Sequence, residues 1–308
     1  MSTVTPATDV APAASAVVDG PADETRRIAR SRRSARKTRA AALKAVLVVL
    51  LLAFTLFPAF WMLSSAFDAK AGTGGQTLFP REFTFDNFAY VLTEGGFDVF
   101  LRNSAIVALV TVLASALLAL LASVAVARFR FRSRTAILLM ILIVQMVPLE
   151  ALVIPLFVQV RDLGLLNTLL GLMVVYVALS LPFGIWMLRG FVAAVPVELE
   201  EAAYIDGASW GRMFRSVLLP LVMPGLVATS VFSFITAWNE FIFAMTLLGG
   251  ASENYTVAIG LKQFFGEHTN EWGYIMAAST IITIPVMIFF VIVQRRLSAG
   301  LVAGAVKG

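Results

Sequence analysis

Long apolar runs alternate with short polar segments along most of the sequence. A helix needs about 20 mostly apolar residues to cross a bilayer, and six runs between residues 45 and 294 reach that length. They are residues 45–67, 103–127, 135–160, 163–188, 216–249 and 272–294. The pattern therefore predicts an all-α membrane protein with six transmembrane helices, in which both termini lie on the same side of the membrane.

Prolines interrupt several of these runs. Pro148 and Pro155 lie in the third run, Pro182 in the fourth and Pro285 in the sixth. A proline removes an intrahelical hydrogen bond and kinks the helix, and such breaks are tolerated at membrane depth where neighbouring helices or water satisfy the backbone. We therefore expect a bundle of kinked helices around a pathway rather than a simple anchor.

Two carboxylates lie inside apolar runs, Glu150 in the third and Glu240 in the fifth. On a continuous helix rising about 1.5 Å per residue, Glu150 would lie about 23 Å from the inner end of its span, with Glu240 at a similar height. A carboxylate in lipid is costly and should face the bundle interior or water. With Trp238 and Asn239, these carboxylates are candidates for the wall of a substrate pathway. The alternative, carboxylates that pack or pair with a neighbouring subunit, fits the sequence equally well.

Basic residues gather in alternate polar segments, which sets the predicted orientation. The basic segments are residues 26–39, 128–134, 189–215 and 295–307. Because basic loops stay in the cytoplasm, these segments and both termini are predicted to be cytoplasmic. Residues 1–40 are expected to form a disordered basic tail rather than a signal peptide, since the first long apolar run begins only near residue 45. Its arginines are attributed to membrane topology and anionic lipid rather than to nucleic acid.

The overall composition narrows the class of function. Hydrophobic residues make up 59% of the 308 residues and charged residues 14%, against roughly 45–50% and about 25% in soluble domains. The chain has no cysteine and one histidine, which excludes disulfides and thiolate or multi-histidine metal sites within it. The phosphate-binding pattern G-x-x-x-x-G-K-[ST] is also absent. These absences predict a non-enzymatic chain with no catalytic residue, cofactor or metal of its own.

The longest cytoplasmic loop, residues 190–220, is predicted to form a helix–turn–helix hairpin. Pro196 suits the first turn of a helix, and the glutamates that follow it favour a helix N-terminus. Gly207 can adopt the left-handed conformation that ends the helix, after which Ser209 can cap a second short helix reaching Leu218. On composition alone the hairpin is either a docking site for a soluble partner or an ordinary interfacial hairpin.

The same loop resembles the EAA loop of binding-protein-dependent ABC importer permeases. The residues that carry the resemblance are Glu201-Ala202-Ala203, Gly207, Val217, Leu219 and Pro220. They match the spacing of that pattern throughout, and the one departure is Val217 in place of isoleucine. Residues 238–241 and 300–308 are similar to the carbohydrate branch of the family, and the likeness is strongest to maltose-type (MalG-type) permeases. It covers about residues 41–308, the predicted permease domain.

The resemblance implies a type I ABC importer permease fold (MetI-like) and a sugar-importing subunit of a bacterial plasma membrane. Such a subunit pairs with a second, similar permease and docks on two cytoplasmic ATPase subunits, which hold ATP and Mg²⁺. An extracytoplasmic binding protein delivers a di- or oligosaccharide such as maltodextrin or trehalose. The implied ATPase-coupling set is Glu201, Ala202, Ala203, Ile205, Asp206, Gly207, Leu219 and Pro220. The matching outer loop, a candidate contact for the binding protein, is Phe264, Phe265, Gly266, Glu267, His268 and Thr269.

Two other functions are weighed against this one. A secondary transporter driven by an ion gradient would import its substrate without ATP, but the sequence shows no inverted repeat and no midplane ion site. A membrane scaffold that only recruits partners would tolerate charge reversal at Glu150 or Glu240.

Overall fold

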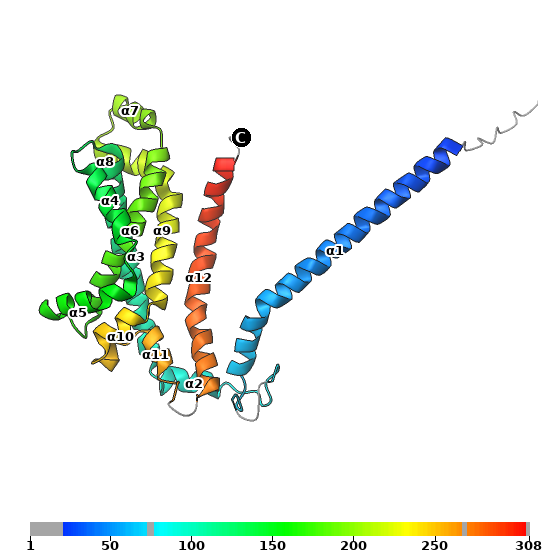
Figure 1. Ribbon diagram of the computed structural model, residues 1–308, viewed down its shortest axis with the longest axis horizontal. Helices are drawn as coiled ribbons and strands as arrows, with labels where there is room; N and C mark the ends of the chain where they lie inside the picture. The colour runs from blue at the N-terminus through cyan, green and yellow to red at the C-terminus, as the bar shows by residue number, and fades with distance from the viewer. Residues whose placement is uncertain (1–20, 73–76, 267–269, 306–308) are drawn as a thin grey trace, which may run out of the picture. The chain divides into compact units, whose positions relative to one another are not determined.

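The described part of the chain is almost entirely helical (Figure 1). The computed structural model describes residues 21–72, 77–266 and 270–305, and the side chains within 41–72, 77–266 and 270–294. The long helices are α1 (Pro21–Ala66), α3 (Phe97–Arg128), α6 (Leu169–Ala194), α9 (Leu219–Asn239) and α12 (Trp272–Ala305). The shorter elements are α2 (Asp86–Thr93), α4 (Arg134–Val144), η1 (Leu149–Leu152), α5 (Val153–Asp162), α7 (Val197–Ile205), α8 (Trp210–Met213), η2 (Phe214–Leu218), α10 (Ile242–Leu248), η3 (Ser252–Asn254) and α11 (Val257–Lys262). The all-α prediction is confirmed.

Helix α1 begins well before the first predicted span. Its residues 41–66 are long and apolar enough to cross a membrane, close to the predicted run 45–67. Residues 21–40 are also helical, so the prediction of a disordered tail is wrong for this stretch. Its commonest residues, arginine and alanine, are both strong helix formers. Residues 1–20 lie outside the described part of the chain. Residues 1–59 and 60–308 form two separate compact units.

The described residues contain five helices long and apolar enough to cross a membrane, and one bent pair raises the number to six. The bent pair consists of Arg134–Val144 and Leu149–Asp162, and the chain bends by 102° between them. The six-span prediction therefore agrees with the fold when this bent pair is counted as one broken span.

The predicted third span is not a continuous helix. Helix α4 ends at Val144, and regular structure resumes only after Pro148. Pro148 cannot donate a backbone hydrogen bond and disfavours helical geometry in the residue before it, which explains the break. Pro155 lies in the first turn of α5, where no intrahelical donor is needed. By contrast, α6 and α12 continue through Pro182 and Pro285. Contrary to the prediction, these two prolines do not interrupt their helices.

The predicted fifth run is also divided. Helix α9 ends at Asn239, Glu240 has an extended backbone, and α10 begins at Ile242. At its other end the span begins earlier than predicted, because α8, η2 and α9 form one apolar helical segment, Trp210–Asn239. The predicted short helix ending at Leu218 is therefore the start of a span. The heights calculated for the two carboxylates assumed continuous helices and no longer apply.

Helices α3, α6 and α9 pack against one another at the centre of the unit formed by residues 60–308. Small residues make this packing close: a Cβ added to Gly184 on α6 would lie 3.0 Å from the Cβ of Ala119 on α3. Ser115 on α3 also donates a hydrogen bond to Ser233 on α9. Such residues allow apolar helices to approach closely in a membrane. The α7–α8 hairpin lies at one end of this trio, and α10 and α11 lie at the other (Figure 1).

Candidate functional sites: a hairpin and a pocket

Helices α7 and α8 form the predicted hairpin, joined by a turn at Gly207. Gly207 has a φ of 78°, and the N–H groups of Gly207 and Ala208 donate to the carbonyls of Tyr204 and Ala203 at 3.0 and 2.9 Å. This is the Schellman ending, in which glycine avoids the strain of a side chain in the left-handed conformation. Ser209 occupies the N-cap position of α8, but contrary to prediction its side chain makes no capping hydrogen bond.

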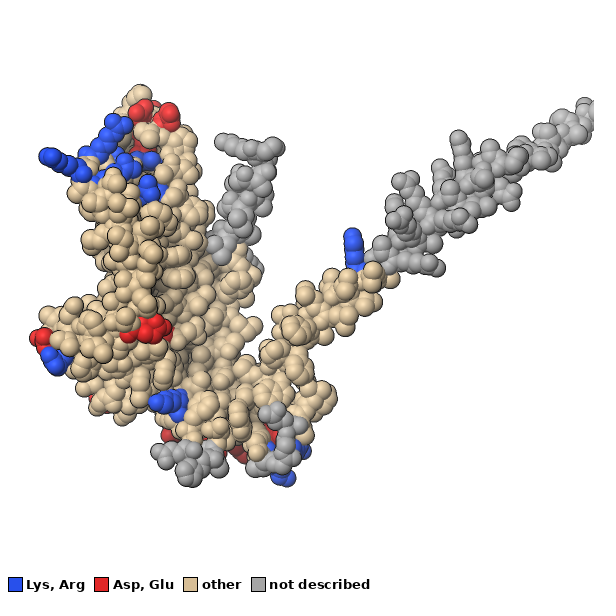
Figure 2. All heavy atoms as spheres, viewed as in Figure 1, with Lys and Arg blue, Asp and Glu red and all other residues tan. Residues whose placement is uncertain are grey.

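The tip of the hairpin presents most of the predicted coupling residues to the outside. The exposed ones at the tip are Glu201, Ala202, Ile205, Asp206 and Gly207. Ile205 is 86% exposed although it is apolar, and a Cβ added to Gly207 would meet no atom within 4 Å. Figure 2 shows acidic side chains gathered at this tip. Ala203 and Leu219 instead pack against the buried apolar cluster beneath the hairpin, and Pro220 lies exposed in the first turn of α9.

Arg128, the last residue of α3, ties the base of the hairpin to the bundle. Its Nε donates to Glu200 Oε1 at 2.7 Å, and its Nη2 donates to the carbonyl of Val195 at 2.9 Å. The two charged side chains are only 14% and 9% exposed. The positive charge of Arg128 is favourable at the C-terminus of α3, and the negative charge of Glu200 is favourable in the first turn of α7, because each is opposite to the partial charge of that helix end. Sequence reasoning missed this pair, because nothing in the sequence links two residues 72 positions apart.

Residues 207–211 also read G-x-S-x-G, a pattern found around hydrolase nucleophiles. In those enzymes the pattern joins a strand to a helix, whereas here it joins two helices. The described residues contain no group of three or more His, Cys, Asp or Glu side chains that could hold a metal ion.

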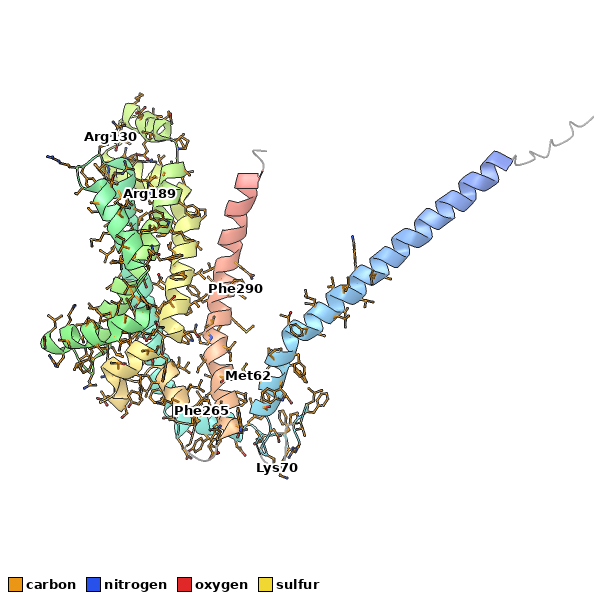
Figure 3. The ribbon with its side chains drawn as sticks, viewed as in Figure 1. Met62, Lys70, Arg130, Arg189, Phe265 and Phe290 are labelled. Carbon is orange, nitrogen blue, oxygen red and sulfur yellow. The ribbon has the colours of Figure 1, made fainter. Side chains whose placement is uncertain are left out.

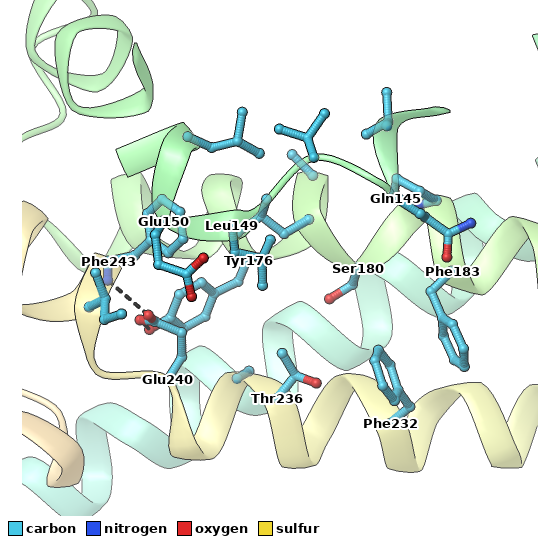
Figure 4. Close-up of a pocket in the computed structure, with 18 residues that line it drawn as sticks. Gln145, Leu149, Glu150, Tyr176, Ser180, Phe183, Phe232, Thr236, Glu240 and Phe243 are labelled. Carbon is cyan, nitrogen blue, oxygen red and sulfur yellow. Dashed lines mark hydrogen bonds between the residues drawn. The ribbon is translucent and has the colours of Figure 1, made fainter. Parts of the chain in front are cut away.

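A pocket of about 310 Å³ opens where two of the membrane segments are broken (Figure 4). Its wall is formed by residues 144–152, α6, the end of α9 and the start of α10. Glu240 accepts hydrogen bonds from the Tyr176 hydroxyl at 2.6 Å and from the N–H groups of Phe243 and Ala244 at 2.8 and 2.9 Å. Glu240 therefore caps α10 and fastens it to α6. Tyr176 was not among the residues that the sequence suggested.

The four predicted pathway residues do not lie together. Glu150 lines the pocket from η1 and points toward Glu240 (Figure 4). Its side chain has no hydrogen bond or ion pair in the described part of the chain. Trp238 is buried, and its indole N–H donates to the carbonyl of Ile282 at 3.2 Å. Asn239 is exposed and donates to the carbonyl of Ile235 at 2.8 Å. The structure therefore brings Glu150 and Glu240 together at the pocket and places Trp238 and Asn239 outside it.

The predicted contact loop for a binding protein is also divided. Phe264 is only 6% exposed and stacks on Phe97 with ring centroids 5.7 Å apart, so it is a core residue rather than a surface contact. Phe265 is 47% exposed, and Gly266 is exposed as well. The remaining residues of the set, Glu267, His268 and Thr269, lie outside the described residues. Figure 3 places Phe265 at the end of the bundle opposite to Arg130 and Arg189, which lie near the hairpin.

A bundle of apolar helices with a broken span, a pocket at the break and an exposed hairpin at one end defines a multi-span membrane permease. The sequence profile of the family described as binding-protein-dependent transport system inner membrane component matches residues 115–302, and the chain belongs to this family. The family prediction made from the hairpin sequence is therefore confirmed, and with it the prediction of a non-catalytic membrane subunit.

Named relatives resemble the chain over most of its length. It is 41% identical over 265 residues to the diacetylchitobiose uptake system permease protein DasC of Streptomyces coelicolor, which covers 85% of this chain and 96% of the relative. It is 36% identical over 266 residues to the trehalose transport system permease protein SugB of Mycobacterium tuberculosis, covering 86% of this chain and 97% of the relative.

Solved ABC transporters share the fold. A bacterial ABC transporter involved in the import of the acidic polysaccharide alginate matches with a TM-score of 0.72 and 25% identity, over 84% of this chain and 97% of that one. A bacterial alginate transporter in complex with an alginate pentasaccharide-bound periplasmic protein matches with a TM-score of 0.56 and 17% identity, over 84% and 93%. The predicted importer permease fold is confirmed.

Proposed function

We propose that this chain is the permease subunit of an ATP-driven importer that carries a di- or oligosaccharide into the cytoplasm by alternating access. Membership of the binding-protein-dependent family carries the proposal, and the substrate class rests on relatives named for diacetylchitobiose and trehalose. The pocket of about 310 Å³ lies within the range of small-molecule sites, roughly 300–1,000 Å³.

The subunit would work as one part of a larger complex in the lipid bilayer. A second, homologous permease completes the pathway, two ATPase subunits with ATP and Mg²⁺ dock on the cytoplasmic side, and an extracytoplasmic binding protein delivers the sugar. The family description and the periplasmic protein bound to an alginate transporter of similar fold support this assembly. The basic segments support an orientation with both termini in the cytoplasm, and nucleic acid has no part in this function.

The α7–α8 hairpin is the ATPase-docking site in this proposal. An exposed isoleucine, Ile205, beside the open space at Gly207 offers a partner both apolar contact and room for close approach. The buried pair of Arg128 and Glu200 supports a firm connection, so that a movement of the hairpin passes to α3 instead of being absorbed by a loose loop. ATP-driven closure of the ATPases would in this way turn the cavity from one side of the membrane to the other.

Two substitutions at Gly207 test the docking role in the reconstituted complex. Gly207→Trp fills the open space, whereas Gly207→Asn adds a small side chain that tolerates the left-handed backbone. We expect Gly207→Trp to abolish ATPase association and sugar uptake, and Gly207→Asn to retain most of both. Gly190→Trp on α6 is the matched control, because an added Cβ there also meets no atom within 4 Å. Normal association and uptake in Gly207→Trp would overturn the docking role.

The alternative function, a secondary transporter driven by an ion gradient, makes a different prediction. It requires sugar uptake by this chain alone in liposomes that carry an ion gradient and no ATP. The proposed function requires the second permease, the ATPases, the binding protein and ATP together, and uptake without them would overturn it.

A further inference from the structure

We infer that the pocket between η1, α6, α9 and α10 selects its sugar by charge, with Glu150 as the carboxylate that faces the substrate. It would take neutral or amino-bearing sugars and reject acidic ones. The inference rests on the proposed function and names the substrate class of the same pocket. It also assigns different roles to Glu150 and Glu240, which the sequence had treated alike.

The carboxylate of Glu240 is already hydrogen-bonded within the protein. A carboxylate has about four acceptor positions, and Glu240 uses three of them for the Tyr176 hydroxyl and two backbone N–H groups of α10. It cannot turn toward a ligand without uncapping α10 and releasing Tyr176. Glu240 is therefore a structural residue that leaves a negative charge in the pocket wall.

Glu150 has the opposite character. It lies on the short η1 element, is exposed at the pocket, and its side chain has no partner among the described residues. The wall around it is mostly apolar, and a carboxylate among apolar side chains needs water or a polar ligand to offset its desolvation. Hydroxyl or ammonium groups of a sugar are donors that would satisfy both of its oxygens.

The remainder of the pocket suits a sugar ring. Phe183 and Phe232 lie at the end away from the glutamates, with ring centroids 3.9 Å apart, and offer an apolar surface for the C–H face of a ring (Figure 4). Gln145, Ser180 and Thr236 provide a few polar groups along the wall. A mainly apolar cavity with a small number of polar groups is typical of small-molecule sites.

The charge of the pocket supplies the selection. Its lining includes Glu150 and Glu240 but no lysine, arginine or histidine among the described residues. An acidic sugar would place its carboxylate next to two others with no cation to offset them, and such unfavourable juxtaposition is a common source of specificity. A transporter of similar fold imports the acidic polysaccharide alginate, so charge selection would distinguish the present chain from it.

The first test measures the potential of the pocket. The chain has no cysteine, so Thr236→Cys introduces a single thiol into this subunit, on the pocket wall. In the full reconstituted complex, labelling rates are measured with a cationic and an anionic methanethiosulfonate of similar size, and labelled subunit is quantified by mass spectrometry. We expect Glu150→Gln to lower the cation-to-anion rate ratio roughly three- to tenfold. Glu94→Gln, which neutralises an exposed carboxylate outside the pocket lining, should leave the ratio unchanged. An unchanged ratio in Glu150→Gln would overturn the inference.

The second test measures which sugars enter. Matched disaccharides are added at high concentration while the Thr236→Cys thiol is labelled with a neutral reagent. The disaccharides are neutral diacetylchitobiose, its deacetylated cationic form, and an anionic disaccharide from alginate. We expect the first two to slow labelling severalfold and the third to leave it unchanged, with Glu150→Gln reducing protection by the cationic sugar. Equal protection by the alginate disaccharide would overturn charge selection.

The outcomes also separate this inference from the function on which it rests. If no sugar protects the thiol while the complex still imports one, the pocket is not a sugar site and the importer function stands. If the complete complex imports no sugar with any binding protein supplied, it is the proposed function that fails.

Discussion

Glu200, in α7, and Glu240, just before α10, occupy comparable places in the chain. The two short helices lie at opposite ends of the bundle (Figure 1). Each stands in or just before the first turn of a short helix, α7 or α10, and each is hydrogen-bonded to a residue of a long helix. The partner of Glu200 is a cation, Arg128, and both side chains are largely buried. The partner of Glu240 is neutral Tyr176, and its other donors are backbone N–H groups.

The difference separates two uses of one residue type. A desolvated ion pair holds two elements in a fixed geometry, and disrupting it leaves the remaining charge buried alone. A carboxylate bonded only to neutral donors keeps its helix in place as well, but the space beside it stays negative. The first arrangement suits a joint that must move as one piece, and the second suits a wall that discriminates among ligands.

Arg128→Ala is expected to have the largest effect, because it removes the positive half of the pair. Glu200 would stay largely buried without its cation, and breaking such a pair typically costs about 3–5 kcal/mol. The hairpin should loosen from α3, and the complex should lose most of the ATP hydrolysis that a sugar-loaded binding protein stimulates. ATPase co-purification and the midpoint of thermal inactivation measure the two consequences.

Arg130→Ala is the matched control for this prediction. Arg130 lies two residues further along and is exposed, so its removal should change stability by no more than about 0.5 kcal/mol. The double variant Arg128→Glu with Glu200→Arg should recover part of the coupling if the pairing itself is what matters. If Arg128→Ala and Arg130→Ala had the same effect on ATPase co-purification and on the midpoint of thermal inactivation, the pair of Arg128 and Glu200 would not be the joint between α3 and the hairpin.

Glu240→Gln is expected to have the next largest effect. The amide keeps one acceptor oxygen but turns the other into a donor, which then faces a backbone N–H or the tyrosine hydroxyl. An unmade hydrogen bond of this kind costs about 1–3 kcal/mol. Amide hydrogen exchange should rise in residues 242–248 and stay unchanged in the hairpin. Protection of α10 equal to that of the parent chain would contradict the capping role of Glu240.

The breaks in the helices show how far the sequence could predict the fold. The length of the apolar runs located the membrane segments, and the position of Gly207 after the predicted helix located the turn. Both are local properties of the chain. The interruption of the third run at Pro148 was expected, but its size was not, since an apolar stretch has the same composition whether it is straight or bent by 102°. The break of the fifth run at Glu240 was not predicted. Pro148 lies at a break while Pro182 and Pro285 do not. Whether a helix breaks at a proline depends on whether neighbouring elements satisfy the backbone groups that the proline leaves unpaired, and this is a property of the tertiary structure.

The candidate site was predicted in part for the same reason. Glu150 and Glu240 were found because a carboxylate inside an apolar run is conspicuous. Tyr176 and Arg128 were missed because their partners lie 64 and 72 positions away, and neither residue is unusual in its own segment. Trp238 was included with Glu240 as part of the segment 238–241, but the end of α9 turns its side chain toward the carbonyl of Ile282.

Tyr176→Phe removes one hydroxyl and should have a smaller effect than Glu240→Gln. Glu240 keeps both backbone donors, so the loss is close to the net value of one hydrogen bond, about 1 kcal/mol. The midpoint of thermal inactivation should fall slightly, and exchange in α10 should rise less than in Glu240→Gln. Because the charge is retained, the cation-to-anion labelling ratio of the pocket should not change. A ratio as low as that of Glu150→Gln would show that the hydroxyl, rather than the carboxylates, sets the potential.

Glu150→Gln should have the smallest effect on stability, within about 0.5 kcal/mol, because the side chain is exposed and bonds to no described residue. It should nevertheless have a large effect on charge discrimination, since it removes the carboxylate that the protein does not itself occupy. The thermal midpoint and the hydrogen exchange of α10 should match the parent chain while the labelling ratio falls. A loss of stability comparable to that of Glu240→Gln would mean that the two glutamates share a structural role. In that case both glutamates would hold the pocket wall together, and neither would be free to bind a sugar.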